Sequence, residues 1–267
     1  MSEIIVITSG KGGVGKTTTT ANLGVGLAME NNKVVLVDTD TGLRNLDLLR
    51  GLENRIMYDL VDVTSGRVPH KKALVRHKKY ESLFLLPTSQ VKDKSAVNPE
   101  QLVFLCEELR KEFDYILIDC PAGIEQGFKT AVAAADCAIV VTMPEISAVR
   151  DADKIVGELG RADKDNIKLI VNRIRPQMVE KGDMLDMEDI NDILSLTCIG
   201  QVPDDETVVS STNRGEPVIT VENSQAGQAY RNIVKRILGE DVPFMTFEKS
   251  GFFDRLKRMF GINGSKA

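Results

Sequence analysis

Residues 9–17 read SGKGGVGKT and contain the pattern G-x4-G-K-[ST]. This pattern is typical of loops that bind nucleotide phosphates, because glycine backbone angles turn amide N–H groups toward the phosphate oxygens. The apolar run Ile4–Thr8 precedes the loop, and a helical pattern at Thr17–Glu30 follows it. A phosphate-binding loop requires this placement, since the helix N-terminus adds partial positive charge at the phosphate. The stretch therefore predicts a nucleotide-binding α/β protein.

Short apolar runs alternate with longer helical patterns along the rest of the chain. Runs that are apolar at every position are typical of strands buried on both faces of a parallel sheet. We therefore expect a doubly wound, mostly parallel sheet flanked by helices. The further expected strands are Val34–Asp38, Leu83–Leu86, Tyr115–Asp119, Ala138–Thr142, Lys168–Asn172 and Cys198–Val202. The further expected helices are Glu100–Lys111, Glu125–Ala134, Ser147–Leu159, Met187–Leu194 and Gln225–Leu238.

Composition argues against several classes of protein. The net charge of −5 disfavours a general nucleic-acid binder, which would usually be basic. No stretch approaches the roughly 18 apolar residues that span a bilayer, and residues 1–8 lack the features of a secretory signal. The four cysteines form no CxxC pair, so we expect reduced thiols in a reducing compartment. These observations predict a cytoplasmic protein.

Three segments place polar residues at one edge of the expected sheet, because the carboxyl ends of its strands meet there. In the loop, Lys16 is expected to hold the β- and γ-phosphates, and Thr17 to offer its hydroxyl to Mg²⁺. Asp38 and Asp119 each end an expected strand. Asp119 is interpreted as the carboxylate on the metal side, and Asp40 as the group that orients a water against the γ-phosphate. Each aspartate could instead be a helix cap or a turn residue.

The run that ends at Asn172 indicates which base is bound. Guanine-specific GTPases carry N-K-x-D at such a position, whereas this chain reads Asn172-Arg173-Ile174-Arg175. An arginine cannot accept hydrogen bonds from the two N–H groups of guanine. ATP is therefore favoured, and the Asn172 amide could contact the adenine edge. In the alternative interpretation, Asn172 is a turn residue at the strand end.

The loop contains a second lysine, Lys11, in the stretch KGGVGKT. This stretch resembles the deviant Walker A (ParA/MinD) family of P-loop ATPases, in which the early lysine crosses a dimer interface to the partner's nucleotide. The resemblance implies an ATPase with ATP and Mg²⁺ as cofactors and with Lys11, Lys16 and Asp40 in catalysis. It implies a metal site of Thr17, Asp38 and Asp119. It implies nucleotide contacts from Gly10, Lys11, Gly12, Gly13, Val14, Gly15, Lys16, Thr17, Thr18, Asn172, Pro203 and Asp204. Lys11 could instead be a solvated loop residue.

Longer stretches, among them GLRNLDL at 42–48 and KGDML at 181–185, extend the resemblance over nearly the whole chain. They are similar to the septum-site-determining branch of the family. The resemblance implies a homodimer that forms with ATP, recruits a MinC-like division inhibitor to the membrane and is released on hydrolysis. It also implies that regulators, MinE-like or other, dock beside Arg44 and Arg150–Asp153. The segment 173–181 is shorter than the corresponding segment of the family and carries different charges.

The C-terminal segment is basic, unlike the rest of the chain. Residues 249–267 hold five basic residues and one acid. Phe252, Phe253, Leu256, Met259 and Phe260 fall on one helical face. A short basic amphipathic helix of this kind is typical of an anchor on an anionic membrane surface. We therefore expect a P-loop ATPase domain at 1–239, a linker at 240–250 and an amphipathic membrane-targeting tail at 251–267. A helix packed on the core is the alternative.

Three rival functions remain at this point. A ParA-type DNA or plasmid partition ATPase would show a basic dimer surface and no lipid-binding tail. A nitrogenase-reductase-like role would need cysteines that bridge a cluster at the dimer axis. An ATP-gated membrane adaptor would bind ATP but hardly hydrolyse it. The acidic body and the tail favour the septum-site function, with the protein reversibly peripheral on the inner face of the cell membrane.

Overall fold

The structure, a computed structural model, describes residues 2–40, 56–89 and 97–246. Its strands are β1 Glu3–Thr8, β2 Val34–Asp38, β3 Val75–Arg76, β4 Leu83–Leu86, β5 Tyr115–Asp119, β6 Cys137–Thr142, β7 Ile167–Ile174 and β8 Thr197–Pro203. Its helices are α1 Lys16–Met29, α2 Leu60–Thr64, α3 His70–Ala73, α4 Pro99–Arg110, α5 Gln126–Ala133, α6 Ile146–Arg161, α7 Pro176–Glu180, α8 Met187–Leu194, α9 Glu206–Asn213 and α10 Gln225–Ile237, with a short 3₁₀ turn, η3, at Val218–Thr220. All the strands and helices expected between Ile4 and Leu238 are present, with ends shifted by at most a few residues.

The strands form one sheet in the order β3-β4-β2-β5-β1-β6-β7-β8. Every neighbouring pair is parallel except β3 and β4, which are antiparallel. The predicted doubly wound, mostly parallel α/β fold is therefore confirmed. The central strand β1 lies between β5 and β6, so the loop that follows it emerges in the middle of the sheet edge.

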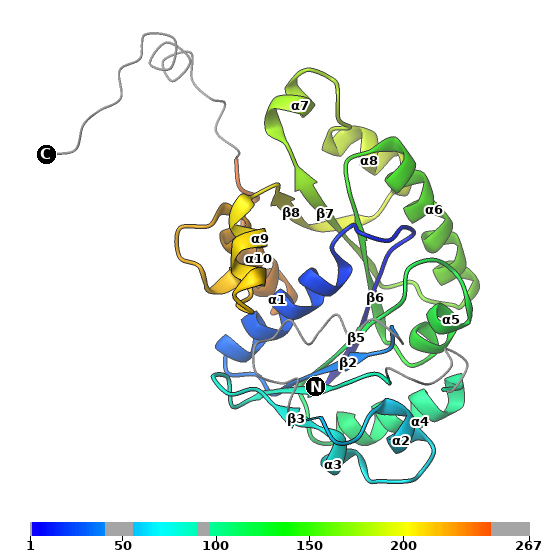
Figure 1. Ribbon diagram of the computed structural model, residues 1–267. Helices are drawn as coiled ribbons and strands as arrows, with labels where there is room; N and C mark the ends of the chain where they lie inside the picture. Colours follow the sequence, from blue (N-terminus) through cyan, green and yellow to red (C-terminus); the bar gives the residue numbers. More distant parts are fainter. Residues whose placement is uncertain (1, 41–55, 90–96, 247–267) are drawn as a thin grey trace, which may run out of the picture.

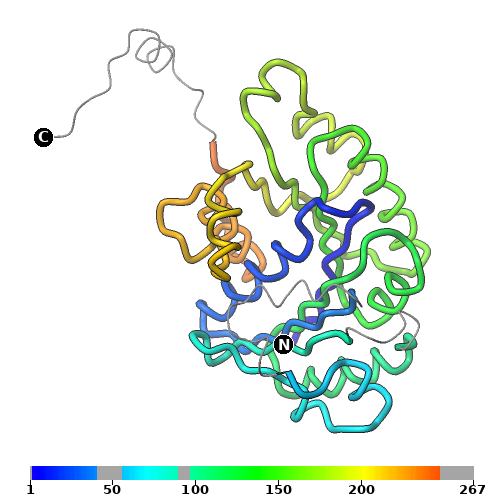
Figure 2. Tube along the Cα trace, viewed as in Figure 1, coloured from blue at the N-terminus to red at the C-terminus, as the bar shows by residue number. Residues whose placement is uncertain are grey.

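Helices cover both faces of the sheet (Figures 1 and 2), and side chains alternate between two cores. In β1, Ile4 and Val6 belong to the core under α4, α5, α6 and α8. Ile5 and Ile7 belong to the core under α1 and α10. Because both faces are buried, each position of the strand must be apolar. This double burial explains why the strands were recognisable as unbroken apolar runs.

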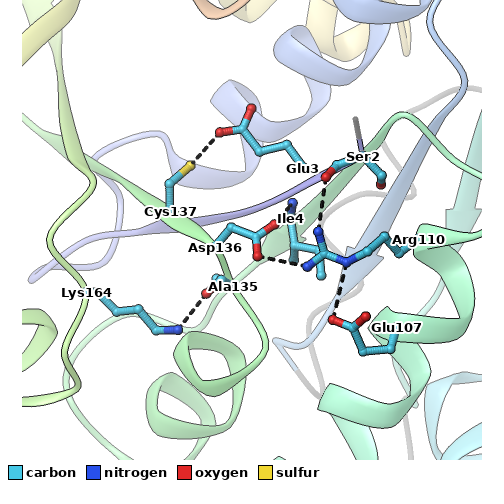
Figure 3. A network of polar contacts seen from close by, with 9 residues as sticks. All are labelled: Ser2, Glu3, Ile4, Glu107, Arg110, Ala135, Asp136, Cys137 and Lys164. Atoms are coloured by element: carbon cyan, nitrogen blue, oxygen red, sulfur yellow. Dashed lines mark hydrogen bonds and ion pairs between the residues drawn. The ribbon is translucent and has the colours of Figure 1, made fainter.

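A polar network joins several elements at the edge of the sheet where the strands begin, opposite the edge where they end (Figure 3). Arg110 of α4 donates to the Asp136 carboxylate at 2.8 Å and to the Ser2 carbonyl at 3.1 Å. Asp136 also accepts the Ile4 amide at 2.8 Å. The network joins α4 to the starts of β1 and β6. It stabilises the fold at the edge remote from the phosphate loop.

Some expected features lie outside the described residues, namely Arg44 and the tail residues Phe252, Phe253, Leu256, Met259 and Phe260. In the part of the chain that is described, no helix is both long and apolar enough to cross a bilayer. The described chain ends at Thr246, after α10 and a segment without regular secondary structure.

Candidate nucleotide-binding site

The loop between β1 and α1 adopts backbone angles that glycine favours. Gly13 has φ 80° and Gly15 has φ 98°, both in the left-handed region. A Cβ atom on Gly15 would lie 2.3 Å from Nδ2 of Asn172. On the other side of the loop, a Cβ on Gly10 would lie 2.2 Å from the Asp151 carbonyl oxygen of α6. The loop is therefore held between α6 and the end of β7, and both contacts require glycine.

The two lysines of the loop have opposite environments. Lys16, the first residue of α1, is only 8% exposed, whereas the Lys11 side chain is exposed. Neither side chain forms an ion pair with a residue in the described ranges. A buried ammonium group needs a compensating negative charge, and a triphosphate in the loop would supply it to Lys16. The exposed Lys11 is free to contact something outside its own subunit.

The predicted carboxylates lie beside the loop. In the parallel register, Asp119 of β5 pairs with both Asp38 of β2 and Ile7 of β1. Asp119 is fully buried and accepts hydrogen bonds from the hydroxyl groups of Thr17 at 2.7 Å and Thr20 at 3.1 Å. Burial raises the pKa of Asp119 to about 6, against the opposing effects of Lys16 and the two threonines.

These oxygen atoms fit a magnesium ion. Mg²⁺ prefers oxygen ligands and keeps several waters, so it binds through one or two protein groups together with substrate phosphates. The Thr17 hydroxyl and the Asp119 carboxylate already lie in contact. Among the described residues no group of three or more His, Cys, Asp or Glu is arranged to hold a metal by itself. The Thr17 and Asp119 oxygens would therefore supply only part of the coordination of Mg²⁺, and phosphate and water oxygens would complete it.

Asp38 and Asp40 follow the same sheet edge. Asp38 is 1% exposed and accepts the Asp40 amide N–H on Oδ1 at 3.0 Å. The Thr39 hydroxyl between them donates to the Asp119 carbonyl at 2.8 Å. These bonds fasten the end of β2 to β5. Asp40 is thereby held at the sheet edge that the phosphate loop also occupies, as the sequence predicted, whereas its role toward water stays a prediction.

Asn172 supports the loop from the side of β7. Its amide Nδ2 donates to the Val14 carbonyl at 2.8 Å, and its Oδ1 accepts the Arg173 amide at 2.9 Å. The structure thus gives Asn172 a positioning contact to the loop. Its contact with adenine remains a prediction.

Pro203 and Asp204 lie at the end of the neighbouring strand β8. Asp204 forms an ion pair with Arg175 at 2.5 Å, and its amide donates to the Ile174 carbonyl at 2.9 Å. Arg175, the residue that is incompatible with guanine recognition, therefore forms an ion pair with a residue of the predicted nucleotide site.

Comparison with known proteins gives the family. The ParA family model, described as NUBPL iron-transfer P-loop NTPase, matches residues 1–238. The septum site-determining protein MinD of Bacillus subtilis is 54% identical over 98% of this chain and 99% of its own length. The chain belongs to the MinD family.

Solved MinD structures agree with the architecture. The MinD chain in the MinC:MinD complex of Aquifex aeolicus superposes with a TM-score of 0.86 at 49% identity, covering 92% of this chain and all of that one. MinD of Pyrococcus horikoshii complexed with Mg-ADP gives a TM-score of 0.79 at 32% identity, covering 89% and 96%. MinD proteins are septum site-determining P-loop ATPases. The prediction of an ATPase that uses ATP and Mg²⁺ is therefore confirmed at the level of the family.

The cysteines of this MinD family chain do not resemble a cluster site. All four are free thiols, and Cys106, Cys120 and Cys137 are buried. Burial raises the pKa of the Cys120 thiol to about 12, and the neighbouring Asp119 carboxylate acts in the same direction. Within the described residues of this chain, the cysteines belong to no group of three or more potential metal ligands.

Two residues of the MinD site were not singled out from the sequence. The Thr20 hydroxyl donates to Asp119 from the same face of α1 as the Thr17 hydroxyl. Thr17 precedes Thr20 by three residues in the sequence. The i, i+3 spacing on the helix that follows the loop was the available signal. Thr39 lies between Asp38 and Asp40, and only these two aspartates were assigned roles from the sequence. Both threonines hold Asp119 in place and have no expected contact with the nucleotide.

Proposed function

We propose that this MinD family ATPase forms a homodimer around ATP, with Lys11 of each subunit reaching the nucleotide of the other. The contrast between the buried Lys16 and the exposed Lys11 carries the proposal. Lys16 and Mg²⁺ together would still leave a net negative charge on a triphosphate within one subunit. A second cation supplied in trans would stabilise the charge on the transferred phosphoryl group, as an arginine finger does with effects of about 10³–10⁵ on rate.

The chemistry is attack of water on the γ-phosphate. In the proposed assignment, Lys16 and the loop amides orient the phosphates, Thr17 and Asp119 would hold Mg²⁺ with Asp38 beside them, and Asp40 orients the water. Mg²⁺ would neutralise charge on the phosphate oxygens when bound. Lys11 completes the site only in the dimer, so hydrolysis by a single subunit is expected to be slow.

Size-exclusion chromatography with light scattering tests the dimer. Wild type is expected to shift from monomer to dimer mass with ATP but not with ADP, and Lys11→Ala is expected to remain monomeric with both. Lys111→Ala is a matched control, because Lys111 is also exposed and follows α4 at the opposite edge of the sheet. A Lys11→Ala protein that dimerises with ATP as wild type does would exclude the bridging role.

We further propose that the dimer binds a MinC-like division inhibitor, with a MinE-like or other protein as regulator. The similarity to the MinD chain of the Aquifex aeolicus MinC:MinD complex supports this partner. Arg150 and Asp153 are exposed on α6, and Ile146 at its start is 49% exposed. Because Gly10 packs on Asp151, α6 is in direct contact with the phosphate loop. A partner on α6 is thus placed to sense the nucleotide.

The membrane role is proposed for residues 251–267, which would place the dimer reversibly on the inner face of the cell membrane. One short tail is expected to bind weakly, whereas two tails on one dimer gain about 10²–10⁴ in avidity. Deleting residues 251–267 should leave ATP binding intact and abolish ATP-dependent sedimentation with vesicles that contain phosphatidylglycerol. Unchanged sedimentation would remove the anchor from the proposal.

A further inference from the structure

The last turn of α10 ends in a helix-terminating motif that turns the chain back. The Glu240 amide donates to the Lys235 carbonyl at 2.9 Å, and the Gly239 amide to the Arg236 carbonyl at 3.1 Å. Gly239 has φ 89°. This pair of bonds with a left-handed glycine is the Schellman motif. It directs residues 240–246 back along the domain instead of away from it.

Arg236 then holds the returning segment. Its guanidinium donates from Nε to the Val242 carbonyl and from one terminal nitrogen to the Pro243 carbonyl, both at 2.9 Å. The other terminal nitrogen donates to the Ile199 carbonyl of β8, also at 2.9 Å. One planar group thus joins the segment after α10 to the edge strand of the sheet. Lysine cannot reproduce this fork of fixed donors.

An aromatic ring covers the same guanidinium. The Arg236 carbon Cζ lies 4.2 Å from the centre of the Phe244 ring, a cation–π contact. Phe244 is 42% exposed, and the next residue, Met245, packs against the core under α1 and α10. Residues 242–245 are therefore bound to the domain by hydrogen bonds, a ring contact and apolar packing. We call Arg236 with residues 242–245 the exit clamp.

We propose that the exit clamp fixes the point at which the tail leaves the domain, and thereby sets the avidity of the ATP-bound dimer for a membrane. This inference rests on the proposed function, since it assumes a dimer with two membrane-binding tails. Of the residues beyond 246, only the proposed membrane binding of the tail and the number of residues before it determine the expected effect. The clamp shortens the tether between the domain and Phe252, the first apolar residue of the tail.

The change in tether length gives the expected size of the effect. With the clamp closed, six residue steps separate Thr246 from Phe252, a reach of at most about 20 Å. With the clamp open, the helix-terminating motif still holds Glu240, and twelve steps separate Glu240 from Phe252, a reach of at most about 40 Å. Effective concentration falls roughly as the −3/2 power of tether length once the tether spans the sites. Opening the clamp should therefore weaken binding of the second tail about threefold.

Arg236→Ala in the full chain tests the proposal by sedimentation with vesicles of equimolar phosphatidylcholine and phosphatidylglycerol. With ATP, the lipid concentration at half-binding should rise about threefold. With ADP, binding through single tails should not change, because it does not depend on tether length. Lys235→Ala is the matched control. Lys235 is the neighbouring cation, with only a 4.0 Å pair to Glu240, and its loss should change neither value.

A local measurement shows whether the clamp has opened. Cleavage within residues 242–246 by a protease of broad specificity, followed by mass spectrometry, should be faster in Arg236→Ala and in Phe244→Ala than in wild type. Phe244→Ala, which removes the ring without touching the domain body, should weaken ATP-dependent vesicle binding in the same direction and decides the question if Arg236→Ala does not fold.

Two outcomes would overturn the proposal. One is unchanged ATP-dependent binding in a variant whose clamp is shown to be open. The other is an equal loss of binding with ADP and ATP, which would place the effect in the tail itself. The proposed function fails separately, if deletion of residues 251–267 leaves vesicle binding intact.

Discussion

At the scale of single residues, Asp119 combines a cost for stability with a role in function. Its carboxyl is fully buried, and burial raises its pKa to about 6, above the ordinary value near 4. The folded state therefore disfavours the ionised form, while the unfolded chain does not. The resulting penalty is absent below about pH 4, grows as the pH rises to about 6, and is then fully present. Two pKa units correspond to about 3 kcal/mol.

We predict that Asp119→Asn raises the stability of the nucleotide-free protein at neutral pH by about 1–3 kcal/mol and lowers ATP hydrolysis by at least about 100-fold. Thermal unfolding without and with Mg-ATP measures the stability of the free protein and its gain from the ligand, and phosphate release measures hydrolysis. Wild type should gain stability from the ligand, and the variant should gain much less. Asp192→Asn, at an exposed position on α8, serves as the control. A lower melting temperature for the ligand-free variant would contradict the account.

The sequence predicted those site residues whose chemistry is local. Gly15, Lys16 and Thr17 follow from one motif, and Asp119 from its place at the end of an apolar run. It did not predict Thr20 or the contact of Asn172 with the loop. These depend on the distance between segments far apart in the chain, such as the 2.8 Å bond from Asn172 to Val14. Hydrogen bonds between such distant segments leave no periodic pattern in the sequence.

At the scale of elements, one carboxylate organises the segment after β8. Asp205 accepts the Thr207 amide at 2.8 Å and the Thr207 hydroxyl at 2.7 Å, at the start of α9. It also accepts the Ser224 hydroxyl at 2.7 Å and the Ala226 amide at 3.1 Å, at the start of α10. The first turns of two helices are thereby joined directly after Pro203 and Asp204. Partial burial would raise the pKa of Asp205, but these bonds outweigh it and lower the pKa to about 2.

We predict that Asp205→Asn destabilises the fold by about 1–2 kcal/mol at neutral pH, after allowance for the solvent exposure of the carboxylate. The folded-state pKa lies below the unfolded value near 4, so this stabilisation is present above about pH 4 and is lost as the pH falls toward 2. Urea unfolding at pH 7 and at pH 3 measures the change. The difference between wild type and variant should shrink at the lower pH, and a difference that grows there would refute the assignment.

Most elements were predicted, but the eight-residue helix α9, the two-residue strand β3 and the three shortest helices were not. β1, β2 and β5 are buried on both faces, so their sequences are apolar without interruption. α2, α3 and α7 have only four or five residues each. Such segments are too short to show a helical period, and their stability comes from capping and packing. The Asp59 capping box of α2 was the signal that remained in the sequence.

At the scale of the whole molecule, the edge of the sheet where the strands begin and the edge where they end have different roles. The edge where the strands begin is closed by the network of Arg110 and Asp136 within one chain (Figure 3). The edge where the strands end holds the buried Lys16 and Asp119 and presents the exposed Lys11. The sequence could place these groups at one edge, because the carboxyl ends of parallel strands meet there. Whether Lys11 acts within its own subunit or in the partner is a property of the assembly, which a single chain does not encode as a local pattern.

A mixture of two inactive variants distinguishes these alternatives. Lys11→Ala lacks the bridging lysine, and Asp40→Ala is expected to lack the water-orienting carboxylate, so each protein alone should be inactive. In a mixed dimer, the site of the Lys11→Ala subunit keeps its own Asp40 and receives Lys11 from the Asp40→Ala partner. One site of the two is then complete. A mixed dimer has only one bridging lysine, so random pairing, in which about half of the dimers are mixed, is an upper limit. At equal amounts and high protein concentration, activity should therefore recover to at most about a quarter of wild type.

If Lys11 acted on the nucleotide of its own subunit, every site in the mixture would lack either Lys11 or Asp40, and no activity would return. Phosphate release from the separate and mixed proteins therefore measures the direction of the contact. Mixing Lys11→Ala with a protein that carries both substitutions is the control, because that partner has no Lys11 to donate. Recovery in the first mixture and none in the second would require the early lysine to cross between subunits. Equal, negligible rates in both mixtures would confine it to its own chain.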